Sequence, residues 1–129
     1  MRAFTILGII GLLFFSCNKN DEADRNSVIG LWKLTAYFIS DGSPGKWQST
    51  IFSHPSYVEF TADQKMITTH DSIVTTTTYT ITSDSTITIQ TQGLVDVPCR
   101  YELKSNELLI FPLNCIEGCA SKYTAVNHK

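Results

Sequence analysis

The chain has 129 residues, of which 43% are hydrophobic, and its 10 basic and 12 acidic side chains give a formal net charge of −2. This length allows one domain that buries roughly two-thirds of its surface on folding. The charge balance excludes the clustered basic footprint of a general nucleic-acid binder. No segment after residue 17 approaches the roughly 20 apolar residues that a membrane-spanning helix needs.

The first 16 residues differ in kind from all that follow. A basic start, Met1-Arg2, precedes an apolar run over 3–15, and the small residue Ser16 stands directly before Cys17. This order of features predicts a secretory signal peptide over residues 1–16. The segment 18–27 is short, polar and charged, which predicts a flexible tether before the folded part.

The segment Phe14-Phe15-Ser16-Cys17 resembles the cleavage box of a bacterial lipoprotein signal, in the relaxed form found in Bacteroidetes-type lipoproteins. The resemblance implies cleavage before Cys17, palmitate-type acylation of that cysteine, and an outer-membrane lipoprotein of the bacterial cell envelope. The acidic residues Asp21, Glu22 and Asp24 resemble a signal for display at the cell surface; a merely solvated spacer is the alternative. An ordinary signal peptide with Cys17 left as a thiol is the alternative to lipidation.

From Val28 onward the hydrophobic pattern repeats every second residue. Trp32, Leu34, Ala36 and Phe38 alternate with Lys33, Thr35 and Tyr37, which predicts a strand with one face on the core. Val58 and Phe60 repeat the pattern, and the segment 73–82 is rich in threonine, a residue that suits strands. Further strands are predicted at 65–70, 86–90, 99–103, 108–113 and 122–126, with turns at 61–64, 83–85 and 105–106.

Seven or eight short strands without helical spacing predict an all-β fold over residues 28–129. We expect a single antiparallel meander β-barrel of about eight strands, because closure removes unpaired strand edges. The segment Asp41–Gly45 has turn chemistry, and it is expected to form part of a mouth loop where a barrel of this kind meets a partner.

Three short motifs carry a resemblance to a known family. Gly30-Leu31-Trp32 resembles the Gly-x-Trp opening of lipocalins, Tyr57-Val58-Glu59-Phe60 resembles the second block of lipocalin-like lipoprotein domains, and the segment from Leu108 through Tyr123 resembles their closing block. The resemblance implies a barrel whose closed end is plugged by Trp32. Its interior either holds one small ligand or is filled by side chains. Candidate residues for lining a ligand cavity are Tyr37, Tyr57, Phe60, Tyr79 and Tyr101.

Three cysteines remain after Cys17, so one disulfide and one free thiol are expected in an exported domain. A tight loop around Glu117-Gly118 favours a bridge between Cys115 and Cys119, and Cys99 with Cys115 is the alternative pair. The spacing of these cysteines is not that of a zinc finger or ribbon, so no metal and no cofactor are expected.

Catalysis has little support in the sequence. His54, His70 and His128 stand singly, without a recognisable nucleophile, and no glycine-rich phosphate loop is present. We therefore expect no enzyme but a monomeric, membrane-anchored lipocalin-like protein that binds a small hydrophobic or amphipathic ligand. The alternative is a filled barrel that serves as an envelope protein-interaction or structural module.

Overall fold

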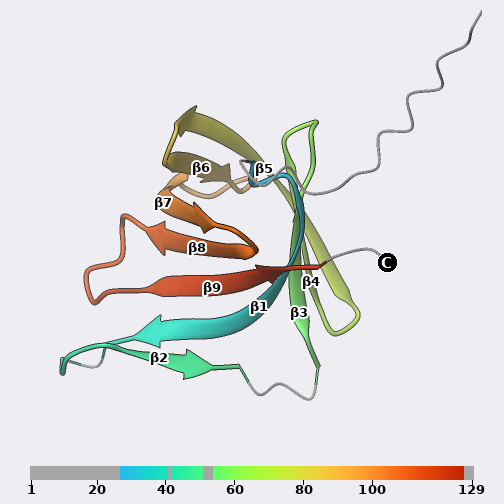
Figure 1. Ribbon diagram of the computed structural model, residues 1–129. Coiled ribbons are helices and arrows are strands. Elements are labelled where there is room, and N and C mark those ends of the chain that lie inside the picture. Colours follow the sequence, from blue (N-terminus) through green and yellow to red (C-terminus); the bar gives the residue numbers. More distant parts are fainter. Residues whose placement is uncertain (1–26, 41, 51–53, 127–129) are drawn as a thin grey trace, which may run out of the picture.

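The computed structural model describes residues 27–40, 42–50 and 54–126, and these residues form an all-β fold (Figure 1). No helix within these ranges is long and apolar enough to cross a membrane. The strands are β1 (Gly30–Ile39), β2 (Lys46–Ser49), β3 (Ser56–Phe60), β4 (Lys65–His70), β5 (Ile73–Ser83), β6 (Thr86–Gln90), β7 (Val97–Lys104), β8 (Glu107–Pro112) and β9 (Ala120–Ala125).

Eight of these strands close into an antiparallel barrel. β1 pairs with β3, the order then runs from β3 to β9 along the chain, and β9 returns to pair with β1. The prediction of an all-β meander barrel of about eight strands is therefore confirmed. The strand directions place Val28 and the end of β9 at one end of the barrel, which we call the closed end. The connections β1–β2, β4–β5, β6–β7 and β8–β9 follow at the other end, which we call the open end.

The strand β1 extends beyond its ladder with β3, and the direction in which its side chains point reverses halfway along it. Its first half pairs with β3, its second half pairs with β2, and the register against β9 shifts between Leu34 and Ala36. Such a bulge adds one residue and reverses which side chains point inward. As a result Phe38 packs on Trp47, with ring centroids 5.5 Å apart. The expectation that Phe38 shares the core face of Trp32 is wrong for this reason.

The short strand β2 was not predicted from the sequence. All four of its residues are exposed, so Lys46–Ser49 carries no hydrophobic alternation that could have revealed it. It forms because the second half of β1 extends beyond β3 and leaves a free edge, to which β2 adds.

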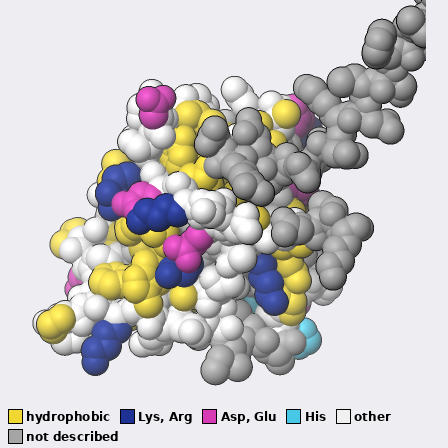
Figure 2. Space-filling view, viewed as in Figure 1, with side chains coloured by type: hydrophobic (Ala, Val, Ile, Leu, Met, Phe, Trp, Pro, Cys, Tyr) yellow, Lys and Arg dark blue, Asp and Glu magenta, His cyan; other side chains and the backbone are white. Residues whose placement is uncertain are grey.

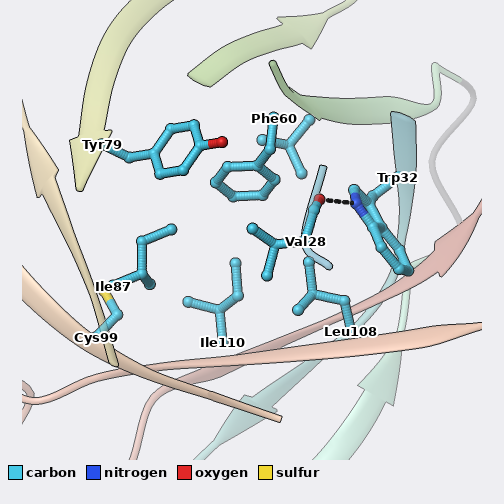
Figure 3. Close-up of a cluster of buried hydrophobic side chains, with 9 residues drawn as sticks. Val28, Trp32, Phe60, Tyr79, Ile87, Cys99, Leu108 and Ile110 are labelled. Atoms are coloured by element: carbon cyan, nitrogen blue, oxygen red, sulfur yellow. Dashed lines mark hydrogen bonds between the residues drawn. The ribbon is translucent and has the colours of Figure 1, made fainter. Parts of the chain in front are cut away.

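The closed end of the barrel is filled by side chains (Figure 3). The Phe60 ring meets the Tyr79 ring edge-on, with centroids 5.1 Å apart, and the Trp32 indole Nε1 donates a 2.7 Å hydrogen bond to the Val28 carbonyl oxygen. Burial of a Trp is favourable only when its N–H finds such a partner. The core cluster consists of Val28, Trp32, Val58, Phe60, Tyr79, Ile87, Cys99, Leu108 and Ile110.

Charged side chains on the barrel surface form small groups of mixed sign rather than a patch of one sign. On the face seen in Figure 2, most Lys and Arg side chains lie beside Asp or Glu. Glu102 accepts contacts from Arg100 at 3.0 Å and Lys104 at 3.4 Å, and Lys122 lies 3.6 Å from Glu107. Exposed pairs of this kind contribute little to stability.

The two tryptophans provide a matched test of the filled end. Trp32 is 2% exposed and Trp47 is 39% exposed. We expect Trp32→Ala to lower the free energy of unfolding by about 3–5 kcal/mol, because it leaves a large cavity. Trp47→Ala removes an edge-on contact with Phe38 and a contact of Lys122 Nζ 4.9 Å from the Trp47 ring centroid, and it should cost about 1–2 kcal/mol. Urea unfolding of both variants measures the difference, and equal losses would contradict this description of the core.

The free thiol of Cys99 is buried, and this burial raises its pKa. A raised pKa leaves less thiolate at any given pH, so Cys99 should react with thiol reagents more slowly than free cysteine. In a Cys17→Ser chain, we expect almost no labelling in the folded state and one labelled thiol per chain in urea. Rapid labelling of the folded chain, or three thiols after unfolding without a reductant, would contradict the arrangement.

Candidate functional site

A recess of about 370 Å³ opens at the open end of the barrel, and we call it the cup. Its walls come from β1, β3, β4 and β9, which are neighbours around the closed barrel. Val58 belongs to both the cup and the core cluster, so the cup lies directly against the filled half. The cup is lined by Leu34, Tyr37, Ser56, Tyr57, Val58, Thr68, His70 and Tyr123.

The polar side of the cup is built by one pair of opposed strand residues. Ser56 of β3 stands opposite His70 of β4, and the Ser56 hydroxyl forms a 2.5 Å hydrogen bond with His70 Nδ1. Ser56 is only 8% exposed, so this bond also satisfies a hydroxyl that water hardly reaches. The pair therefore presents a fixed imidazole and hydroxyl beside the apolar side chains of Leu34 and Val58.

Three phenols, those of Tyr37, Tyr57 and Tyr123, also line the cup. Burial raises the pKa of Tyr37, and burial likewise raises the pKa of Tyr123, which a hydrogen bond with Ser121 partly offsets. A raised phenol pKa means that both hydroxyls stay uncharged across the physiological range. Among the described residues that line the cup, none is Lys, Arg, Asp or Glu. The cup thus offers hydrogen bonds but no fixed charge to pair with a charged ligand group.

The sequence did not show that two histidines share one carboxylate. His54 Nδ1 lies 3.1 Å from Asp71 Oδ1, and His70 Nε2 lies 3.8 Å from Asp71 Oδ2. Asp71 has a φ of 55° in the two-residue turn between β4 and β5. This turn brings Asp71 against the segment before β3. The expectation that His54 and His70 stand singly is wrong, because the β4–β5 turn holds Asp71 within contact distance of both.

His54 and Asp71 also line a second recess, of about 420 Å³, at the outer face of β3 and β4. A hydrolytic triad would need the carboxylate to hold the imidazole by a hydrogen bond. The 3.8 Å separation between His70 Nε2 and Asp71 Oδ2 is too long for one. Within the described ranges no group of three or more His, Cys, Asp or Glu side chains could hold a metal ion. The second recess is lined by His54, Pro55, Tyr57, Thr69, Asp71 and Ser72.

The five aromatic residues proposed from the sequence are divided between the cup and the core. Tyr37 and Tyr57 line the cup. Phe60 and Tyr79 are in the core cluster, and Tyr101 packs against it, so these three fill the interior instead. Ser56 and His70 also line the cup and were not predicted to do so. The signal for them was weak, because each is a polar residue at an inward position of a strand.

The remaining site residues lie at the two ends of the barrel. Gly30 has a φ of 139°, where glycine is favoured, and starts β1 two residues before Trp32 at the closed end. The structure joins Cys115 and Cys119 by a disulfide in the β8–β9 connection, with Cα atoms 5.9 Å apart. The proposed lipidation site Cys17 and the third histidine, His128, lie outside the described residues.

Comparison with known proteins supports this architecture. The family model of the lipocalin-like domain matches residues 28–110, from the entry into β1 to β8. The match ends before the disulfide and β9, which the structure shows to complete the barrel. A search of curated proteins found no match. A closed barrel with a recess at one end fits a binder of small ligands. The chain belongs to the lipocalin-like domain family.

Proposed function

We propose that this protein is a membrane-anchored carrier that binds one small, uncharged amphipathic molecule in the cup. The observation that carries the proposal is the composition of the cup. It places the apolar side chains Leu34 and Val58 beside the Ser56–His70 pair, with no charged carboxylate or ammonium group in its described lining. Sites for small molecules usually combine an apolar wall with a few fixed polar groups in this way.

The size of the cup limits the ligand. Its 370 Å³ lies near the lower end of the roughly 300–1,000 Å³ that is typical for ligand sites. The core cluster below it is filled, so a long acyl chain has no room to extend toward Trp32. We therefore expect a compact ligand, with its polar group near His70 and its apolar part against Leu34 and Val58.

A second candidate function has its own support. The filled closed end favours the alternative of a protein-interaction or structural module of the envelope, because side chains occupy the part of the barrel that an open carrier would leave free. The two candidates differ in what they require of the cup. Only the carrier requires the cup to be vacant and accessible.

The cup is tested by filling it with a large side chain. Thr68 lines the cup, whereas Thr82 is exposed on β5. We expect Thr68→Trp to weaken binding of the uncharged fluorescent probe N-phenyl-1-naphthylamine about tenfold or more, a loss of about 1.4 kcal/mol. Thr82→Trp should leave probe binding unchanged. The titration is followed by probe fluorescence.

Native mass spectrometry of the same proteins, isolated from their host, supplies the complementary measurement. A co-purifying small molecule should be present on the wild-type chain and on Thr82→Trp but absent from Thr68→Trp. If the wild-type chain carries no ligand and binds neither the probe nor other uncharged amphipathic molecules, the carrier function is wrong and the interaction module stands.

The membrane anchor is a separate part of the proposal. Its support is the lipoprotein-like segment that ends at Cys17, together with the entry of the chain into the barrel through Val28 at the closed end. With acyl chains on Cys17 in the outer membrane, the tether over 18–27 would join the lipid to the closed end of the barrel. Several acyl chains would hold the protein firmly, since each buried methylene contributes about 0.8 kcal/mol.

Replacing the lipidated residue tests the anchor directly. We expect Cys17→Ser to move the protein from the membrane fraction to the soluble fraction of the envelope and to abolish incorporation of labelled palmitate. A Cys99→Ser chain is the matched control and should remain in the membrane fraction with its label. A Cys17→Ser chain that keeps both the label and the membrane association would exclude lipidation at this residue.

A further inference from the structure

One strand of the barrel has a neighbour along only part of one edge. β5 pairs with β4 from Ile73 to Thr78 and with β6 from Thr78 to Ser83. Among the described residues, the segment Ile73–Thr77 therefore pairs on the β4 side alone. We call the other side of this segment the open edge. The barrel is closed by the Thr78–Ser83 ladder, and the stagger of β6 means that β6 does not cover the open edge.

The direction of one hydrogen bond shows which residues present backbone groups to the open edge. The Tyr79 N–H donates to the Gln64 carbonyl oxygen at 3.0 Å, on the β4 side. Backbone groups of successive strand residues point to alternate sides, and the register from Ile73 to Thr78 is continuous. Val74 and Thr76 therefore direct their N–H and C=O groups toward the open edge. No described residue forms a backbone hydrogen bond with the N–H or C=O groups of Val74 or Thr76.

The open edge lacks the features that normally protect a sheet edge. Proteins block edge strands with charged residues, proline or bulges. Ile73–Thr77 contains none of these, and Ile73 and Val74 are 66% and 61% exposed. The comparable overhang of β1 is covered by β2, which pairs with its second half. The open edge of β5 has no such covering strand among the described residues.

We propose that the open edge binds the same edge of a second copy of this chain. In an antiparallel pair about a two-fold axis, Val74 of each copy faces Thr76 of the other, and the two pairs exchange four backbone hydrogen bonds. Thr75 then meets its own counterpart on the axis. The segment is uncharged and rich in strand-forming residues, so self-pairing brings together no like charges.

The second copy is the occupant that the sequence of the segment favours. An edge that recognises a different protein usually adds side-chain pockets or charges for specificity. Here the five residues offer only backbone groups and uncharged β-branched side chains, which can pair with the same segment of a second copy. An interface of this length is smaller than that of a stable dimer. The association should therefore be weak and depend on protein concentration, in contrast to the monomer expected from the sequence.

Disulfide trapping in the full chain tests the proposal. Opposed Cα atoms at a non-hydrogen-bonded antiparallel pair are about 4.5 Å apart, which is within the range that a disulfide spans. We expect Thr75→Cys, purified in mild detergent, to form a covalent dimer under mild oxidation. Thr82→Cys, on the part of β5 that β6 covers, should form at least about tenfold less dimer at equal concentration, because no symmetric contact holds it.

A proline distinguishes edge pairing from random collision. Thr76→Pro added to Thr75→Cys removes the N–H that faces the open edge but none of the hydrogen bonds to β4. We expect it to lower the dimer yield roughly tenfold, since it removes two of the four intermolecular hydrogen bonds. Thr76→Val keeps the N–H and should preserve the dimer. Circular dichroism checks that each variant remains folded.

If the proline variant unfolds, Val74→Lys replaces it, because this change puts a charge on each copy at the contact and should lower the yield in the same way. Equal dimer yields from Thr75→Cys and Thr82→Cys, or a yield that neither Thr76→Pro nor Val74→Lys reduces, would overturn the proposal. None of these residues lines the cup, so the outcome is independent of ligand binding.

Discussion

The structure depends on the ability of β1 to pair along both of its edges. One edge carries the ladder to β9, which joins the end of the domain to its beginning, and the other carries β3 and then β2. This closure turns a meander of short strands into a barrel with a common interior, so that side chains from distant segments can share one core. Trp32 stands on the half of β1 that pairs with β3. Its buried indole is satisfied only because the chain entering the barrel brings the Val28 carbonyl within 2.7 Å.

The bulge in β1 separates the two halves of the interior. Before the bulge, Trp32 and Leu34 point inward, and the first of them joins the filled core. After it, Tyr37 lines the cup while Phe38 turns outward onto Trp47. The strand thus contributes a bulky apolar side chain at the closed end and a phenol at the open end. A regular strand would have continued the apolar face of Trp32 and Leu34 into the region where the cup now opens.

The open end combines three kinds of chemistry within a short distance along the chain. The Ser56–His70 pair lines the cup, Asp71 in the next turn contacts both His70 and His54, and the exposed edge of β5 begins two residues later. The β4–β5 hairpin contributes a part to each of them, namely His70, Asp71 and the open edge, and it extends past the part of the barrel that β6 covers. The proposed ligand site therefore borders the β4 strand of this hairpin, next to β3, and the proposed contact between copies uses the free edge of its β5 strand.

The sequence by itself determined the all-β class, most strand positions and the buried role of Trp32. A period of two and an abundance of Thr, Val and Ile are local properties, and each strand expresses them independently of its neighbours. Only the tertiary structure decided that Phe38 points toward Trp47 and that β2 exists. It also decided that Phe60 and Tyr79 lie in the core and that two histidines contact Asp71. The physical reason is that a bulge, a stagger and a hairpin turn set which residues meet. These features arise from pairing between strands, so no single segment carries the information that would reveal them.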